Sequence, residues 1–193
     1  MFVNVVSLNE KYLNNYDVVM IGGIDACDNY FTNKENLMVL IQKVKAYHND
    51  GKSILFLHDA IFVQHLLWKE FTEPLFGKYK NLNYDENDKS WFTSNSIKLD
   101  KDDPFVSKYA FNLSEQINDG KMAIARSHQT IIWEKEEKIK RIMYGDIHEK
   151  RPNARHYIEV DRVGLIEATH TPINENEEKL IYNIVCYLST QHI

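Results

Sequence analysis

Apolar residues in this chain of 193 residues fall into short, nearly continuous runs that polar stretches separate. The strongest run is Ile54–Leu57, which is preceded by Ser53 and ended by His58 and Asp59. A short unbroken apolar run is typical of a strand that is buried on both faces, as inside a parallel sheet. Further runs that predict core strands are 17–23, 121–125 and 163–168.

Helical periodicity lies between the first two of these core strands. Apolar residues recur at helical spacing from Leu37 to Val44, and we expect this helix to end near Asn49, with Gly51 as its C-terminal stop. Strand, helix and strand over so short a stretch form a βαβ unit. Such a unit predicts two parallel strands joined by a right-handed crossover.

The rest of the pattern completes one α/β domain over 1–193. A helix is expected over 60–71, and the irregular stretch 71–103 is interpreted as an insertion or lid at the edge of the sheet. Alternation of polar and apolar residues over 155–160 predicts a half-exposed strand. Asn174 and Glu177 have the spacing of a capping box and start a closing helix.

Composition restricts the classes of partner. The chain is 44% hydrophobic and 26% charged, with a net charge of -5 and no basic stripe, which excludes nucleic acid as the main partner. No apolar stretch approaches the roughly 20 residues of a membrane span. Cys27 and Cys186 could form one disulfide, but the usual burial of cysteine favours two free thiols. A complete chain would be cytoplasmic and a domain of a surface protein extracellular, and the oligomeric state stays open.

Histidines stand just after three of the predicted core strands. In open α/β sheets, ligands bind beyond the carboxyl ends of the strands, so these histidines and nearby charged residues are the candidate ligand-binding site. The candidates are His58, Asp59, Asp25, Arg126, His128 and His170.

Three chemical interpretations of this group stay open. The side chains could line a pocket for a small polar molecule. His58, His128 and His170 could instead bind a divalent metal or act as general acids and bases, since imidazole suits both tasks. Alternatively, each histidine could simply hydrogen-bond the backbone of its own loop.

Nucleophilic catalysis has little support in the sequence. Cys27 does not follow the strand 53–57, and Cys186 lies in the closing helix. Ser127 stands beside His128, but the glycines of a nucleophile elbow are missing.

The order of elements resembles the class I glutamine amidotransferase-like superfamily. That resemblance implies a flavodoxin-like three-layer α/β/α sandwich with a mostly parallel central sheet. In true amidotransferases a nucleophilic Cys follows the central strand, and a His-Pro-Glu motif stands near the C-terminus. Here the strand ends in His58-Asp59 and the later motif is His170-Thr-Pro172, so the resemblance implies the fold without amidotransferase activity.

Two branches without amidotransferase activity are similar to this chain. The ThuA-like group often carries a histidine after the central strand, as His58 does, and implies an enzyme of sugar metabolism with a histidine-rich cleft and an optional metal. The other branch, an uncharacterised amidotransferase-like domain of large microbial surface proteins, implies a catalytically degenerate module that binds a small polar ligand such as a carbohydrate. The chain is similar to this second branch at Tyr109-Ala-Phe111, Ser127-His128-Gln129, Asn153-Ala-Arg-His-Tyr157, Gly164, His170 and Asn183.

Overall fold

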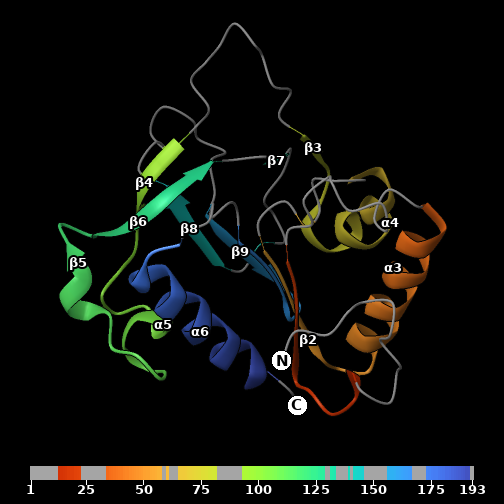
Figure 1. Ribbon diagram of the computed structural model, residues 1–193, viewed down its shortest axis with the longest axis horizontal. Coiled ribbons are helices and arrows are strands. Elements are labelled where there is room, and N and C mark those ends of the chain that lie inside the picture. The colour runs from red at the N-terminus through yellow and green to blue at the C-terminus, as the bar shows by residue number, and fades with distance from the viewer. Residues whose placement is uncertain are drawn as a thin grey trace, which may run out of the picture.

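The computed structural model describes residues 13–22, 34–57, 60, 65–81, 93–128, 131–133, 139, 141–145, 156–166 and 173–191. They form three layers, in which α3 and α4 lie on one side of a central sheet and α5 and α6 on the other (Figure 1). The helices are α3 (Lys34–Asn49), α4 (His65–Phe76), α5 (Pro104–Ser107), the 3-10 turn η2 (Ser114–Gln116) and α6 (Glu175–Ser189). The strands are β1 (Val18–Ile21), β2 (Ser53–Phe56), β3 (Tyr79–Asn81), β4 (Thr93–Lys98), β5 (Ile117–Asn118), β6 (Lys121–His128), β7 (Ile131–Trp133), β8 (Arg141–Gly145), β9 (Tyr157–Val160) and β10 (Val163–Ile166).

The described strands form an eight-stranded sheet in the order β1-β2-β10-β9-β8-β4-β6-β5, and β3 pairs separately with β7. β1, β2 and β10 are parallel neighbours, which confirms the predicted βαβ unit of β1, α3 and β2. All other neighbours in the sheet are antiparallel. From these pairings, β1, β2, β10, β8 and β6 run in one direction, and β9, β4 and β5 run in the other. Most strands therefore share one direction, as predicted, within a mixed sheet.

Strand β2 is buried along its whole length, as its unbroken apolar run predicts. Ile54 and Phe56 belong to the core cluster under α3 and α4, whereas Leu55 belongs to the cluster under α6. Ser53 is also fully buried, and its hydroxyl donates a 2.8 Å hydrogen bond to the carbonyl of Leu188 on α6. Alternate residues of one strand thus join the sheet to a helix layer on each face.

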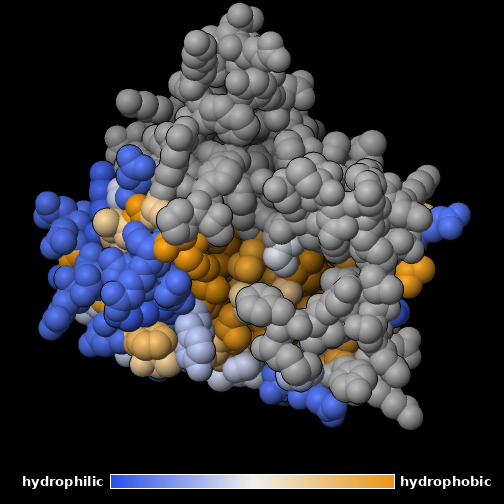
Figure 2. Space-filling model, in the orientation of Figure 1, coloured by the Kyte–Doolittle hydropathy of each residue, from blue (hydrophilic) through white to orange (hydrophobic). Residues whose placement is uncertain are grey.

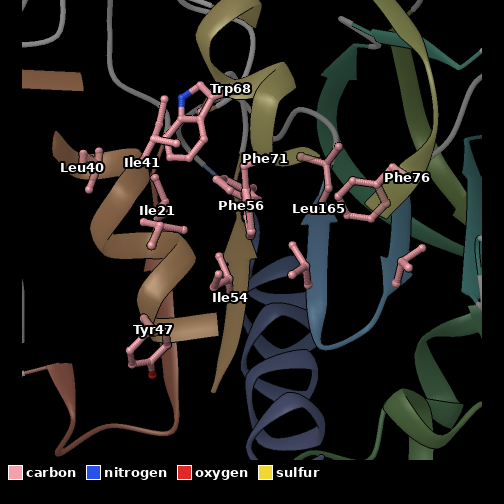
Figure 3. Close-up of a cluster of buried hydrophobic side chains, with 14 of the residues drawn as sticks. Ile21, Leu40, Ile41, Tyr47, Ile54, Phe56, Trp68, Phe71, Phe76 and Leu165 are labelled. Carbon is pink, nitrogen blue, oxygen red and sulfur yellow. The ribbon is translucent and has the colours of Figure 1, made fainter. Parts of the chain in front are cut away.

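Aromatic side chains fill the core between the sheet and the α3–α4 layer (Figure 3). The ring of Trp68 on α4 meets Phe56 edge-on, at 5.0 Å between centroids, and Phe71 lies beside it. The helix was expected to cover 60–71, but it extends to Phe76 and includes Pro74. Phe76 is itself buried, so packing against the sheet stabilises this last turn despite the proline.

Strand β9 differs from its prediction. Alternating polarity predicted a half-exposed strand, yet all residues of Tyr157–Val160 are buried and Glu159 is only 2% exposed. The prediction was wrong because β9 lies inside the sheet, between β10 and β8, and both of its faces are covered.

Two further segments are more regular than their sequence indicated. β6 was expected over 121–125 but continues to His128, so Arg126 and His128 belong to the strand instead of following it. The stretch 71–103, interpreted as an insertion or lid, contains the end of α4 and the strands β3 and β4. β4 lies inside the main sheet, between β8 and β6.

The closing helix α6 begins and packs as predicted. Leu180, Ile184 and Leu188 are buried against the sheet. The outer surface of α6 and α5 is mostly hydrophilic, and apolar residues reach the surface beside it (Figure 2). Met20 on β1 is 45% exposed. Cys186 on α6 is a half-buried free thiol, as favoured above, whereas Cys27 lies outside the described residues. Within the described part of the chain, no helix is both long and apolar enough to cross a membrane.

Candidate functional site at the carboxyl edge of the sheet

Most of the candidate residues follow strands whose ends the structure describes. Asp25 comes after β1, His58 and Asp59 come directly after β2, and His170 comes after β10; these four residues lie outside the described part of the chain. Because β1, β2 and β10 are parallel neighbours, their carboxyl ends lie at one edge of the sheet. In open α/β sheets this edge is the usual place for a ligand.

Backbone hydrogen bonds fix the chain on both sides of the His58-Asp59 pair. The N–H of Leu57 donates to the carbonyl of Ile21, at 2.9 Å, which continues the pairing of β2 with β1. The N–H of Ala60 then donates to the carbonyl of Leu57, at 3.0 Å. The chain therefore leaves the sheet immediately after β2.

The other two candidates, Arg126 and His128, belong to β6, which runs in the same direction as β2 and β10. The carboxyl end of β6, at His128, therefore faces the same edge of the sheet. However, β9, β8 and β4 separate β6 from β10. Measured along the sheet, that separation is roughly 19 Å at the usual spacing between strands.

The start of α6 is attached directly to β6. The side-chain amide of Asn174 donates to the carbonyl of Ala123, at 3.3 Å, and the Oε2 atom of Glu177 accepts from the N–H of Ala125, at 2.7 Å. The chain therefore passes from the end of β10, at Ile166, to β6. The eight residue steps from Ile166 to Asn174 could span about 26 Å when extended, which is enough to cover that distance.

Asn174 and Glu177 also form the predicted capping box of α6. The side chain of Asn174 accepts from the N–H of Glu177, at 3.0 Å, and Oε2 of Glu177 accepts from the N–H of Asn174, at 3.2 Å. One carboxylate oxygen thus binds two backbone donors, one on the helix and one on β6. The sequence predicted the first contact; the second depends on how α6 crosses the sheet.

The carboxyl group of Glu177 is in an unusual environment. The side chain is only 1% exposed, and Oε1 is buried without a hydrogen-bond partner among the described residues. Burial raises the pKa of Glu177 above its usual value, although the N–H groups of Ala125 and Asn174 act in the opposite direction. Burial disfavours the charged form, and among the described residues only Oε2 accepts hydrogen bonds that offset this effect.

A second buried carboxyl group, that of Glu159 on β9, lies beneath α6. The hydroxyl groups of Tyr157 and Tyr187 lie 3.2 Å and 3.0 Å from its two oxygens, as donors. Gly164 on the neighbouring strand leaves the space in which the Tyr157 ring lies. Tyr157 and Gly164, two of the residues that carry the family resemblance, therefore build the core between the sheet and α6.

Asn183, another residue of that resemblance, docks the segment that follows α5. Its side chain accepts from the N–H of Phe111, at 3.0 Å, and donates to the carbonyls of Phe105 and Phe111, at 2.6 and 2.8 Å. The ring of Tyr109 lies edge-on to that of Tyr187. Asn183 is fully buried, so these contacts are structural.

Two histidines outside the candidate group have structural positions. His48, at the end of α3, is buried, and its Nε2 lies 2.7 Å from the carbonyl of Asp161 in the turn between β9 and β10. His156, just before β9, is buried as well. Burial lowers the pKa of His156 to about 4, so this imidazole is neutral at physiological pH.

The described residues contain no cluster of three or more His, Cys, Asp or Glu side chains that could hold a metal ion. His58 and His170, which were metal candidates, lie outside them. A divalent metal at this edge therefore stays a prediction from the sequence.

Comparison with known proteins bears on the fold. No protein-family model matches the chain, and no curated protein matches its sequence. In structure it is similar to the cytoplasmic protein STM3548 of Salmonella typhimurium, with a TM-score of 0.54 and 11% identity over 93% of this chain and 74% of that one. It is also similar to a glutamine amidotransferase of Thermotoga maritima, with a TM-score of 0.47 and 11% identity over 94% of this chain and 67% of that one. At this identity, the likeness to the Salmonella protein shows a common α/β fold.

Proposed function

We propose that this chain is a catalytically degenerate amidotransferase-like domain that binds a small polar ligand at the carboxyl edge of its sheet. It would act alone or as a module of a larger surface assembly. Carbohydrates are the first ligand class to test, because carboxylate, imidazole and guanidinium groups together supply the donors and acceptors that hydroxyl groups need. The proposed contacts are His58, Asp59, Asp25, Arg126, His128 and His170.

The observation that carries this proposal is the parallel arrangement of β1, β2 and β10. Three neighbouring strands end at one edge, and each is followed by a candidate side chain: Asp25, His58 or His170. The attachment of α6 to β6 adds support, because it directs the chain that carries His170 toward the strand that carries Arg126 and His128.

The residue that follows β2 supports binding over amide hydrolysis. The residue that follows Leu57 after β2 is His58, where true amidotransferases carry their nucleophilic Cys. Cys186 lies near the C-terminal end of α6, close to Leu188, whose carbonyl is bound by Ser53 at the amino end of β2. That thiol is therefore remote from the edge at which the candidate residues stand.

A ligand screen on the purified chain tests the proposal. Thermal unfolding would be followed with D-glucose, D-glucuronate, D-glucose 6-phosphate and L-glutamine, each titrated to millimolar concentration. A ligand present at 100 times its Kd stabilises the folded state by about 2.7 kcal/mol and so raises the Tm. We expect at least one sugar compound to do so.

Substitutions identify the site in the same screen. His58→Ala and His170→Ala should each abolish the shift, whereas Glu115→Gln, an exposed change on the 3-10 turn η2, should preserve it. The proposal is contradicted if no compound shifts the Tm, or if the shift persists in both histidine variants.

The alternative is a ThuA-like enzyme of sugar metabolism with a metal in the histidine-rich cleft. It is favoured by one observation, the histidine directly after β2, where the ThuA-like group carries one. Metal analysis of the purified chain separates the two functions. Stoichiometric metal, together with a chelator-sensitive Tm that His58→Ala makes insensitive, would support the enzyme.

A further inference from the structure

The carboxylate of Glu177 joins three parts of the fold that are distant in sequence. Through Oε2 it binds the N–H of Ala125 on β6 and the N–H of Asn174 at the start of α6. Asn174 in turn binds Ala123, two residues before Ala125 on β6. Since Asn174 also marks the end of the connection from β10, Glu177 fixes where that connection meets the sheet.

The strand that Glu177 binds is irregular at this point. β4 and β6 pair at Ser96 with Ala123 and again at Ser94 with Ser127, so more residues of β6 than of β4 lie between the two pairs. Ala125 is within this bulge. Bulges are over-represented beside active sites, where they redirect a side chain, and Arg126 follows Ala125 directly.

The burial of Glu177 is costly, which also points to more than a capping role. Oε1 has no hydrogen-bond partner among the described residues, and an exposed capping residue would avoid that cost. Natural proteins keep such locally unfavourable groups mainly at functional sites.

We infer that Glu177 is a positioning residue of the proposed site, because its carboxylate fixes the start of α6, at Asn174, on the bulged part of β6, whose following residues Arg126 and His128 are proposed contacts. The role in a site rests on the proposed function, whereas the contacts of Glu177 do not. The geometry predicts that loss of this carboxylate frees both the start of α6 and the bulge of β6 while the rest of the sheet keeps its stability.

Hydrogen–deuterium exchange of the full chain tests this inference with three variants. Glu177→Ala removes the acceptor, and we expect exchange to rise at least tenfold in peptides that cover 121–128 and 173–178. Glu177→Gln keeps an acceptor oxygen for Ala125 and should restore slow exchange. Glu178→Gln, the same chemical change on an exposed neighbour, should leave exchange unchanged.

The peptide that covers 34–57 is the internal control, because the described hydrogen bonds of the Glu177 carboxylate come from Ala125 and Asn174, which lie outside α3 and β2. The inference is overturned if Glu177→Ala leaves 121–128 and 173–178 at the native rate, or if it raises exchange equally in 34–57. Should Glu177→Ala fail to fold, Asn174→Ala, which removes the contact with Ala123, is measured in the same way.

Binding then shows whether the positioning matters to the site. Each variant is titrated with D-glucose, D-glucuronate and D-glucose 6-phosphate. We expect Glu177→Ala to weaken binding at least tenfold and Glu177→Gln to restore it; unchanged affinity in Glu177→Ala would overturn the role in the site. If none of these compounds binds the native chain, the proposed function fails, and the exchange measurement still decides whether Glu177 holds the start of α6 on β6.

Discussion

The ring of Tyr157 lies directly against Gly164 on the neighbouring strand. A Cβ atom added at Gly164 would come within 3.0 Å of Cε2 and Oη of Tyr157 and of Cδ1 of Leu55. This close approach lets the Tyr157 hydroxyl lie 3.2 Å from the buried carboxylate of Glu159. A glycine in the middle of a buried strand therefore makes room for a polar contact in the core.

We predict that Gly164→Ala destabilises the chain by about 1–3 kcal/mol, the usual cost of overpacking a close-packed core. Urea unfolding measures the loss. Gly22→Ala is the matched control, because no atom of the described residues lies within 4 Å of a Cβ at Gly22, so the free energy of unfolding should change by no more than about 0.5 kcal/mol. Equal stability of the two variants would contradict the tight contact.

Asn183→Ala should destabilise the chain by roughly 3 kcal/mol, because it removes the partners of the N–H and carbonyl of Phe111 and of the carbonyl of Phe105. Urea unfolding gives the magnitude, and exchange of the Phe111 amide should accelerate. The control is Gln42→Ala on the exposed side of α3, for which a change within about 0.5 kcal/mol is expected. A small effect at Asn183 would mean that the segment after α5 is held by its aromatic contacts alone.

Acid should destabilise the chain through His156. Its folded pKa of about 4 lies below the ordinary histidine value of 6.5, so between these pH values the unfolded chain binds more protons than the folded chain. The stabilising contribution is therefore present above pH 6.5 and is lost as the pH falls toward 4, by up to about 3 kcal/mol. The difference in unfolding free energy between the native chain and His156→Phe, measured from pH 7 to pH 4, should follow this loss. A difference that does not vary with pH would contradict a buried neutral imidazole.

Glu177 should lower the stability of the chain as the pH rises, which is the opposite of the effect of His156. Burial raises its folded pKa above the ordinary glutamate value of 4.5, so just above pH 4.5 the folded chain keeps a proton that the unfolded chain has released. Stability is therefore lost as the pH rises from 4.5 through the folded pKa. Glu177→Gln cannot ionise and should gain stability relative to the native chain as the pH rises from 4 to 7, as thermal unfolding would show. If stability depended on pH in the same way in the native chain and in Glu177→Gln, the hydrogen bonds of the carboxylate would fully offset the cost of its burial.

The turn between β9 and β10 should tolerate glycine at Arg162. Asp161 and Arg162 both have positive φ, at 45° and 63°, in a two-residue turn that glycine usually occupies. Glycine removes the steric strain that a side chain has at positive φ, and this gain should exceed the cost of the extra conformational entropy of the unfolded chain. We therefore predict that Arg162→Gly raises the free energy of unfolding by up to about 1 kcal/mol. The converse change at Gly120, where φ is 70°, should cost about 1 kcal/mol when the residue becomes alanine. Thermal unfolding of both variants checks the pair.

Several features of this protein are determined by the sequence alone, because they depend on residues that are close together in the chain. The unbroken apolar run identified β2 as buried on both faces, and helical spacing with Gly51 placed the end of α3 at Asn49. The spacing of Asn174 and Glu177 identified the start of α6. Each signal arises from local periodicity or capping, which needs no knowledge of distant partners.

Other features were decided by the tertiary structure, because strand order and burial depend on pairing between distant segments. Alternating polarity predicted that β9 would be half-exposed, and only its place between β10 and β8 explains why Glu159 is buried. Parallel pairing predicted that the strands before His58 and His170 end at the same edge of the sheet. The strand order, which no local pattern reveals, places three strands between β10 and β6. The second contact of Glu177, with Ala125, exists because α6 crosses the sheet to reach that strand. A hydrophobic pattern predicts that a strand is buried, while the fold decides which other strands and side chains lie beside it.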